Sequence, residues 1–278
     1  MNLFTGKRET LGAANLNRVS DRTFSPNLLM TNSVNAYRAP SFAYWGSKTK
    51  QAPAICASAP PTGDIFAEVF AGRGNVFWQA SSVLDYAHWW LNDTRTGDFF
   101  SAIKRVGHKV VVPERDGSSS HHLFYKEQCR RLSGKNYSDE ARVLEPYLTR
   151  NGGGYLAVGA RTSGGGPGAE GYTRSLRQAH QIMHATNPVI TNWDYEQVLE
   201  CLGPNDFAMV DPPYIGASVG SYGAADLDHK RLIIWLKYAK FRWILCEYPH
   251  LVCRRTFGQP FWSKRVHRPC HPDRPRYF

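Results

Sequence analysis

The chain has 278 residues, of which 42% are apolar, and it carries a formal net charge of +11. This length and apolar content suit one large domain or a domain with a substantial insertion, and they exclude wholesale disorder. No apolar run approaches the roughly 18 residues needed to cross a bilayer, and the first residues lack the apolar core of a secretory signal. We therefore expect a soluble, intracellular protein, and the basic surplus suits a polyanionic partner.

The first part of the chain predicts an arm followed by a βαβ unit. Residues 1–40 carry few apolar periods and many Asn, Arg and Ser, which is typical of an N-terminal arm with little core of its own. After the turn-rich stretch SFAYWGSKTKQ, a short apolar run at 64–70 is punctuated by Gly72 and Gly74, and NVFWQASSVLDYA shows helical spacing. A second short strand ends at Asp93, and a helical pattern continues to residue 106. The order strand, glycine turn, helix, strand, acid, helix predicts a βαβ unit.

The composition changes between residues 107 and 186, where it becomes polar, basic and rich in Gly, His and Arg. HHLFYKEQCRRL, ARVLEPYLTR and TRSLRQAHQIMHA predict helices, while NGGGYLAVGARTSGGGPGAEGY holds too much glycine for a regular element. We interpret residues 107–186 as an inserted, mainly helical basic region and as the candidate for contact with a polyanion such as double-stranded DNA. Its candidate phosphate contacts are Arg130, Arg131, Arg142, Arg150 and Arg161.

Residues 187–278 return to an alternation of strands and helices. PVITNWDYEQVLECL predicts a strand, an acid and a helix; FAMVDPPY predicts a strand, DLDHKRLIIWLKYAK an amphipathic helix, and FRWILCEYP a further buried strand. Together with residues 41–106, this pattern predicts one α/β domain with a Rossmann-like, mostly parallel sheet covered on both faces. Ligands of such sheets bind beyond the carboxyl ends of the strands. Asp93, Asp194 and Asp211 all fall near predicted strand ends.

The glycine turn and Asp93 together indicate a nucleoside ligand. Gly72 and Gly74 permit a sharp turn and a close approach of a ligand to the backbone. Asp93 follows the turn by about 20 residues, at the end of the next strand, where an acid can accept hydrogen bonds from ribose hydroxyls. The turn lacks the Gly-Lys-Ser/Thr of a phosphate-binding loop. The alternative for Asp93 is a cap on the following helix.

The stretch Asp211–Tyr214, DPPY, combines two acceptors with an aromatic ring. A carboxylate at a strand tip accepts a hydrogen bond from an amino group, and Pro213 keeps Pro212 out of the helical region, so that the Pro212 carbonyl stays available. Tyr214 offers a face for a planar base. This combination matches an exocyclic amine on an aromatic heterocycle.

Three motifs in this order resemble the Dam-like class of DNA adenine-N6 methyltransferases. YWGSK at 44–48 resembles Y-x-G-G-K, EVFAGRGN at 68–75 resembles E-P-F-x-G-x-G, and DPPY is the last motif of that class. The segments NDTR and TNWDYEQVL also lie where that class carries its ribose-binding acid and the segment before the catalytic strand. The resemblance covers roughly residues 42–248.

The resemblance implies a class I methyltransferase fold and the cofactor S-adenosylmethionine. It places the glycines near the amino-acid end of the cofactor, with Tyr44 and Lys48 nearby, Asp93 on the ribose and Asp194 on the adenine amine. It implies catalytic roles for Asp211, Pro212 and Tyr214 on an adenine flipped out of DNA. The cofactor contacts implied by the three motifs are Tyr44, Trp45, Lys48, Glu68, Phe70, Gly72, Gly74, Asp93, Asp194 and Asp211. We expect a monomer or weak dimer, in the cytoplasm of a prokaryotic or phage-infected host cell.

The chain departs from the motifs of that class at three positions. Ser47 replaces a glycine, Val69 replaces a proline, and the bulky Arg73 lies between the two glycines. These departures leave open a catalytically degenerate protein that binds nucleic acid. The amine chemistry also leaves open cytosine N4 or an RNA base as the acceptor. A protein glutamine ranks lower, because that activity usually goes with asparagine in place of Asp211.

Overall fold

The computed structural model describes residues 2–6, 39–44, 46–114, 128, 138–148, 168–215, 227–248, 250–260 and 262–263. Within these residues, a sheet of seven strands forms the centre of the molecule, in the order β4-β3-β2-β5-β6-β1-β7. The strands are β1 Asn2–Gly6, β2 Thr62–Glu68, β3 Asp85–Asn92, β4 Val189–Thr191, β5 Phe207–Val210, β6 Arg242–Glu247 and β7 Trp262–Ser263. β4, β3, β2, β5 and β6 run parallel, and β1 is antiparallel to both β6 and β7. The predicted α/β fold with a mostly parallel, Rossmann-like sheet is confirmed.

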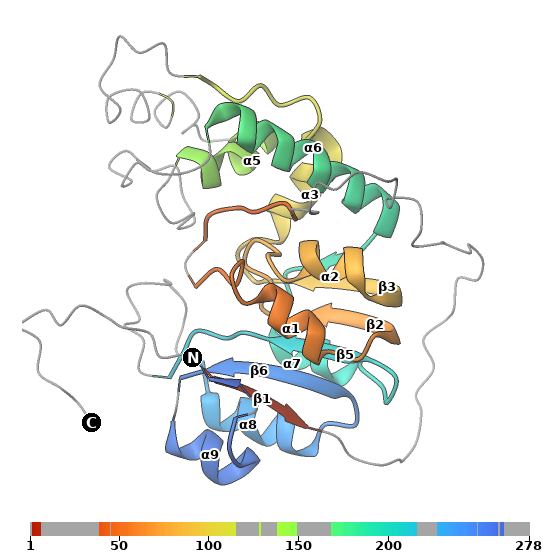
Figure 1. The fold of residues 1–278 in the computed structure, drawn as a ribbon, viewed down its shortest axis with the longest axis vertical. Helices are drawn as coiled ribbons and strands as arrows, with labels where there is room; N and C mark the ends of the chain where they lie inside the picture. The colour runs from red at the N-terminus through yellow and green to blue at the C-terminus, as the bar shows by residue number, and fades with distance from the viewer. Residues whose placement is uncertain are drawn as a thin grey trace, which may run out of the picture.

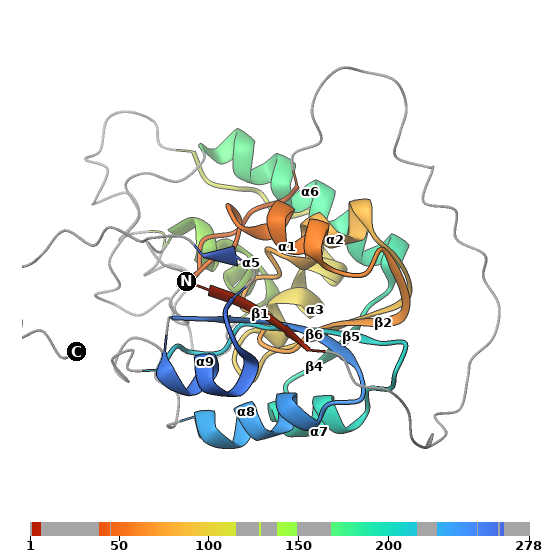
Figure 2. The same cartoon turned by 60° about the horizontal axis from the view of Figure 1, so that its bottom comes forward.

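Helices cover both faces of this sheet. On one face lie α1 Ala52–Ser58, α2 Phe77–Val83, α3 Gly97–Val106, α5 Asp139–Leu148 and α6 Ala169–Thr186, and on the other lie α7 Tyr195–Glu200, α8 His229–Tyr238 and α9 Leu251–Phe257 (Figures 1 and 2). None of the described helices has the length and apolar character that crossing a bilayer demands.

Successive side chains along the central strands point to opposite faces of the sheet, so the core is divided into two clusters. In β5, Phe207 and Met209 pack toward α1 and α2, while Ala208 and Val210 pack toward α8. All four side chains of β5 are fully buried. Because both faces are covered, this strand reads as the continuous apolar run FAMV and lacks a polar face.

The strand order reverses between β2 and β5, and this reversal positions the site. β2 continues through β3 to β4 on one side, whereas β5 continues to β6 on the other. The crossover connections leave a crevice at the carboxyl ends of β2 and β5, where ligands of doubly wound sheets bind. The glycine turn follows β2, and the DPPY stretch follows β5.

The start of the chain differs from the predicted arm. Asn2–Gly6 forms β1, which pairs with β6 over five residues and also with β7. The short, unpatterned segment NLFTG gave no periodic signal, because a strand placed by distant partners needs little amphipathic pattern of its own.

The described helices of the predicted insertion, α5 and α6, pack against α3 and share the apolar core on that side of the sheet. Leu144 of α5 and Tyr172 and Leu176 of α6 are fully buried there. The Tyr172 hydroxyl donates a hydrogen bond of 2.6 Å to the Val143 carbonyl. These two helices therefore rest on the same core as the sheet.

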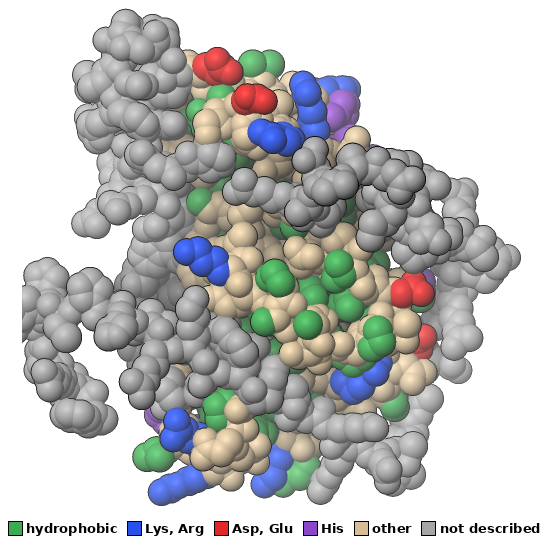
Figure 3. All heavy atoms as spheres, in the orientation of Figure 1, with side chains coloured by type: hydrophobic (Ala, Val, Ile, Leu, Met, Phe, Trp, Pro, Cys, Tyr) green, Lys and Arg blue, Asp and Glu red, His purple; other side chains and the backbone are tan. Residues whose placement is uncertain are grey.

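The described surface in the view of Figure 3 carries scattered Lys and Arg side chains that form no continuous band. Arg142, a predicted phosphate contact, makes ion pairs with Asp98 and Asp139. The other predicted phosphate contacts, Arg130, Arg131, Arg150 and Arg161, lie outside the described residues.

Candidate active site at the carboxyl edge of the sheet

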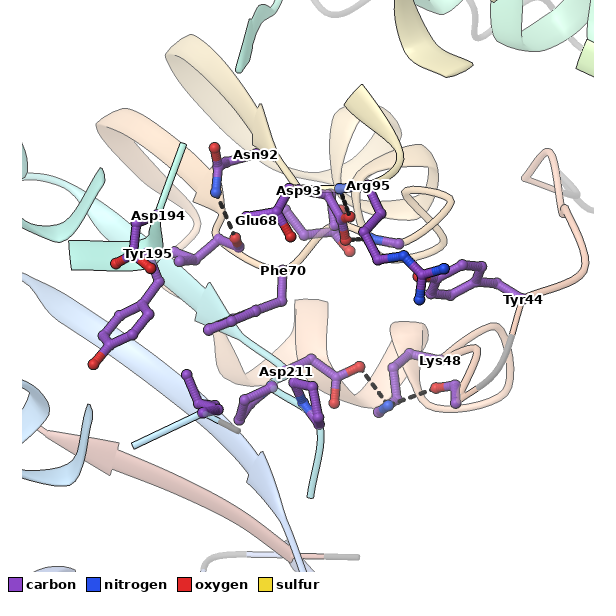
Figure 4. Close-up of a pocket in the computed structure, with 18 of the residues that line it drawn as sticks. Tyr44, Lys48, Glu68, Phe70, Asn92, Asp93, Arg95, Asp194, Tyr195 and Asp211 are labelled. Atoms are coloured by element: carbon purple, nitrogen blue, oxygen red, sulfur yellow. Dashed lines mark hydrogen bonds and ion pairs between the residues drawn. The ribbon is translucent and has the colours of Figure 1, made fainter. Parts of the chain in front are cut away.

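A cavity of about 800 Å³ opens at the carboxyl ends of β2, β3 and β5. It brings together ten of the predicted site residues, several of which are drawn in Figure 4: Tyr44, Lys48, Glu68, Phe70, Gly72, Asp93, Asp194, Asp211, Pro212 and Tyr214. Gly74 does not line the cavity, and Trp45 lies outside the described residues. Segments that are far apart in the sequence thus converge on one concave site.

The two glycines of the turn adopt backbone conformations that other residues avoid. Gly72 has φ +54° and Gly74 has φ +70°. A Cβ on Gly72 would lie 2.7 Å from the Tyr44 ring, and a Cβ on Gly74 would lie 2.9 Å from Phe100. The glycines are therefore required by the turn and by these two aromatic rings.

Two acidic side chains, those of Glu68 and Asp93, accept hydrogen bonds from backbone amides around this turn. Glu68, at the end of β2, accepts a hydrogen bond from the Phe77 amide at the start of α2, at 2.9 Å. Burial raises the pKa of Glu68 to about 8, against the opposing effect of this amide, and the charge of Asp211 raises it further. Asp93 accepts from the Gly72 amide through Oδ2, at 2.9 Å. Hydrogen bonds to these two acids thus hold the turn in place.

Asp93 also accepts hydrogen bonds from the amides of Arg95 and Thr96 through Oδ1, at 2.8 and 3.0 Å. It therefore organises the backbone that enters α3, as the capping alternative anticipated, although the N-cap position itself is Thr96. Because each carboxylate oxygen has about two lone-pair sites, Oδ2 retains capacity for one more donor on the cavity side. A ribose role for Asp93 stays a prediction.

Arg73 departs from the motif for a structural reason. Its guanidinium forms an ion pair with Glu145 of α5, with 2.7 Å between Nη2 and Oε2, and both side chains are buried. The guanidinium carbon also lies 4.3 Å from the centroid of the Phe99 ring. The side chain between the two glycines thus joins the turn to the neighbouring helical layer.

Asp194 is the N-cap of α7. Its carboxylate accepts from the Glu196 amide at 3.0 Å, and the Gln197 side chain accepts from the Asp194 amide, which completes a capping box. Asp194 therefore caps the helix that follows it. Asp194 is also exposed at the cavity, so contact with a ligand stays a separate prediction.

Asp211, which follows β5, forms an ion pair with Lys48, and the two side chains point toward one another from different elements (Figure 4). The Lys48 ammonium also donates to the Gly46 carbonyl at 2.6 Å. Burial raises the pKa of Asp211, while Lys48 and the side chain of Tyr214 act to lower it. The other carboxylate oxygen, Oδ1, is buried and has no hydrogen-bond partner of normal geometry among the described residues.

The two proline carbonyls of DPPY differ in their partners. The Pro213 carbonyl lies 2.7 Å from His229 Nε2, which must donate because a carbonyl only accepts. Within the described residues, no hydrogen bond ends on the Pro212 carbonyl. The Pro212 carbonyl therefore keeps its accepting capacity, and its role beside Asp211 stays a prediction. The ring of Tyr214 lines the cavity and meets Tyr248 edge-on, with 4.5 Å between centroids.

Three residues of this region escaped the sequence analysis. Asn92, at the end of β3, is buried and bonds to the Val69 carbonyl and to both the amide and carbonyl of Trp193, so it ties together the ends of three strands. Trp193 lines the cavity with its side chain 43% exposed. Glu247, at the end of β6, accepts from the Tyr248 amide at 2.7 Å, and burial raises its pKa to about 7. An acid after the apolar run FRWILC was the available signal for Glu247.

An aromatic pair forms the wall between the turn and α7. Phe70 stacks on Tyr195, with 5.7 Å between centroids and 28° between planes. The Tyr195 hydroxyl donates to Glu196, which forms an ion pair with Arg231 of α8. Apolar rings and a few convergent polar groups are what a pocket for an organic ligand needs.

No protein-family model matches the chain, and no curated protein matches it by sequence.

Proposed function

We propose that the protein transfers a methyl group from S-adenosylmethionine to the exocyclic N6 amine of adenine in DNA. One observation carries this proposal. Asp211 and Pro212 are neighbours that both line the cavity, and the Asp211 Oδ1 atom and the Pro212 carbonyl have no hydrogen-bond partner among the described residues. A primary aromatic amine is the group that two adjacent acceptors complement.

The residues present fit the proposed cofactor. The cavity volume of about 800 Å³ lies within the range of small-molecule sites, which is roughly 300–1,000 Å³. Asp93 keeps accepting capacity for a ribose hydroxyl, Asp194 presents an exposed carboxylate, and Phe70 and Tyr195 supply an apolar wall. S-adenosylmethionine, when bound, supplies an electrophilic methyl group on a sulfonium.

Residues of the chain activate the amine that receives the methyl group. The lone pair of an aromatic amine is delocalised into the ring, which makes the amine a poor nucleophile. Hydrogen bonds to Asp211 and to the Pro212 carbonyl draw the nitrogen toward tetrahedral geometry and localise the lone pair. Positioning and fixed dipoles account for most of the rate in such a site.

Adenine reaches this cavity only outside the duplex. Flipping a base costs a few kcal/mol, and stacking on an aromatic side chain returns about 1–3 kcal/mol. Tyr214 lies next to Asp211 and provides such a ring. The same site accommodates an RNA base or cytosine, so the base that receives the methyl group has to be identified by experiment.

The test is transfer of a labelled methyl group to duplex DNA, RNA and protein in parallel. We expect label on the N6 of adenine in duplex DNA, and loss of transfer with retained cofactor binding in Asp211→Ala. Asp64→Ala, an exposed acid at the opposite end of β2, serves as the matched control. Retained transfer in Asp211→Ala contradicts the proposal, and failure to bind S-adenosylmethionine in calorimetry favours a non-enzymatic nucleic-acid-binding protein.

A further inference from the structure

Lys48 lies at the centre of a group of buried acids. Its side chain is 5% exposed, and it comes from the turn before α1, whereas its partner Asp211 follows β5. Burial raises the pKa of Asp211, Glu68 and Glu247, and the positive charge of Lys48 opposes that rise in each, most of all in Asp211. One ammonium group therefore acts on three carboxylates that come from three different strands.

The ammonium group is fixed in position by two contacts. A buried lysine is costly unless it is paired and hydrogen-bonded. Lys48 meets both conditions, because it pairs with Asp211 and donates to the Gly46 carbonyl of its own turn. The turn thus holds the ammonium, and the ammonium holds the carboxylate.

We propose that Lys48 is a positioning residue, which anchors one oxygen of Asp211 and keeps the carboxylate available as an acceptor for the substrate amine. This inference rests on the proposed methyl transfer. It assigns Lys48 to the part of the site that binds the methyl-accepting amine. The resemblance had placed it beside the amino-acid end of the cofactor.

The carboxylate can serve Lys48 and a substrate together. An ionised carboxyl group has about four lone-pair sites; the Lys48 bond uses one on Oδ2, and the side chain of Tyr214 also acts on this carboxylate, so that acceptor sites remain. Oδ1 is shielded from solvent. An incoming amine therefore shares Oδ2 with Lys48 or displaces the groups that cover Oδ1.

The charges around Asp211 explain why it needs a cation. Glu68 of β2 and Glu247 of β6 face it, the Cys246 thiol beside it has a pKa raised by burial, and Tyr214 lies on its own stretch. Without Lys48, burial favours protonation of Asp211. A protonated carboxyl has one O–H donor and fewer free acceptor sites, which weakens its ability to accept a hydrogen bond from an amine.

The first measurement follows the Asp211 carboxyl in the ligand-free protein by ¹³C NMR, in wild type, Lys48→Met and Lys48→Gln. Removing an opposite charge at this range raises a carboxyl pKa by about 1–3 units, so we expect an upward shift of that size in both neutral variants. Lys48→Arg keeps the charge and is expected to shift the titration less. Lys50→Met, an exposed lysine two positions away, is the matched control and leaves the titration unchanged.

Two further measurements separate positioning from cofactor binding. In Lys48→Met we expect the affinity for S-adenosylhomocysteine, by calorimetry, to stay within about threefold, while kcat falls and the acid limb of the pH profile moves upward with the Asp211 pKa. An unchanged Asp211 titration overturns the inference. Lost S-adenosylhomocysteine affinity with an unchanged pH profile also overturns it and assigns Lys48 to the cofactor. A wild-type protein that methylates none of the acceptors overturns the proposed function instead, whatever the titration shows.

Discussion

Arg73, between the two glycines of the turn after β2, is joined to Glu145 of α5 by a buried ion pair of 2.7 Å. The two side chains are 3% and 4% exposed. Removing one partner of such a pair leaves the other charge buried and unpaired. The turn that lines the cavity therefore depends on a helix that the sequence placed in a separate inserted region.

Arg73→Met is expected to lower the free energy of unfolding by about 3–5 kcal/mol, because Glu145 is left as an uncompensated buried charge. The double variant Arg73→Met/Glu145→Leu is expected to be less destabilised than the sum of the two single variants. Urea unfolding of the four proteins in this cycle measures the coupling. Arg174→Met, at an exposed ion pair with Glu170, is the control and is expected to cost under about 1 kcal/mol. Additive single effects would contradict the coupling.

Gly72→Ala is expected to destabilise the protein by at least about 1–2 kcal/mol, since the left-handed conformation alone costs that much for a residue with a Cβ. The added Cβ also meets the Tyr44 ring. Tyr44→Ala in the same chain should recover the steric part of the loss and leave the backbone part. Gly168→Ala, where the added carbon has no neighbour within 4 Å, should change the unfolding free energy by less than about 1 kcal/mol. Equal losses at both glycines would disprove the role of the turn geometry.

Stability is expected to fall as the pH rises from about 5 to 8. An unfolded glutamate titrates near 4.3, whereas burial raises the pKa of Glu68 to about 8. Within this window the folded state binds more protons than the unfolded state, so each increase in pH favours unfolding. Glu247, with its pKa raised to about 7, acts in the same direction.

Glu68→Gln should flatten this dependence, because glutamine cannot ionise and its oxygen can still accept from the Phe77 amide. Urea unfolding at pH 5, 6, 7 and 8 gives the slopes. Glu200→Gln, an exposed acid at the end of α7, should keep the slope of wild type. If Glu68→Gln also keeps that slope, Glu68 ionises freely in the folded protein and the prediction is wrong.

Two substitutions of Asp194 separate its cap from a ligand role. Asp194→Ala removes the cap and should cost about 1 kcal/mol, while Asp194→Asn keeps a capping oxygen and should be nearly neutral. If the carboxylate also binds the adenine amine of the cofactor, both variants lose affinity for S-adenosylhomocysteine in calorimetry. Affinity that falls only in Asp194→Ala would limit this residue to helix capping.

The sequence predicted the central strands because each is a short apolar run that ends in an acid. Asp93 and Asp211 were found in this way, and the parallel sheet brings their strand ends to one edge. The same rule applied to β6 would have found Glu247. β1 escaped because Asn2–Gly6 is placed by residues more than two hundred positions away, and single-sequence periodicity carries no information about such partners.

The site was harder to predict where a side chain's role depends on its surroundings. Arg73 departs from the motif in the sequence, and only the position of Glu145 explains it. Lys48 was expected near a cofactor because its motif suggested so, and its ion pair with Asp211 spans 163 positions. Asn92 opens the NDTR segment, which gave a role to Asp93 alone, although the hydrogen bonds of Asn92 hold the ends of β2, β3 and β4 together.

The placement of β1 between β6 and β7 has a consequence for biosynthesis. During synthesis, Asn2–Gly6 is made more than two hundred residues before its partners Arg242–Glu247 and Trp262–Ser263. Because loop closure over such a separation is slow and must await both partners, the nascent chain carries Asn2–Gly6 unpaired until those residues have been made. Completion of this sheet edge therefore waits until residues 242–263 have been made, and until then the unpaired strand is open to chaperones.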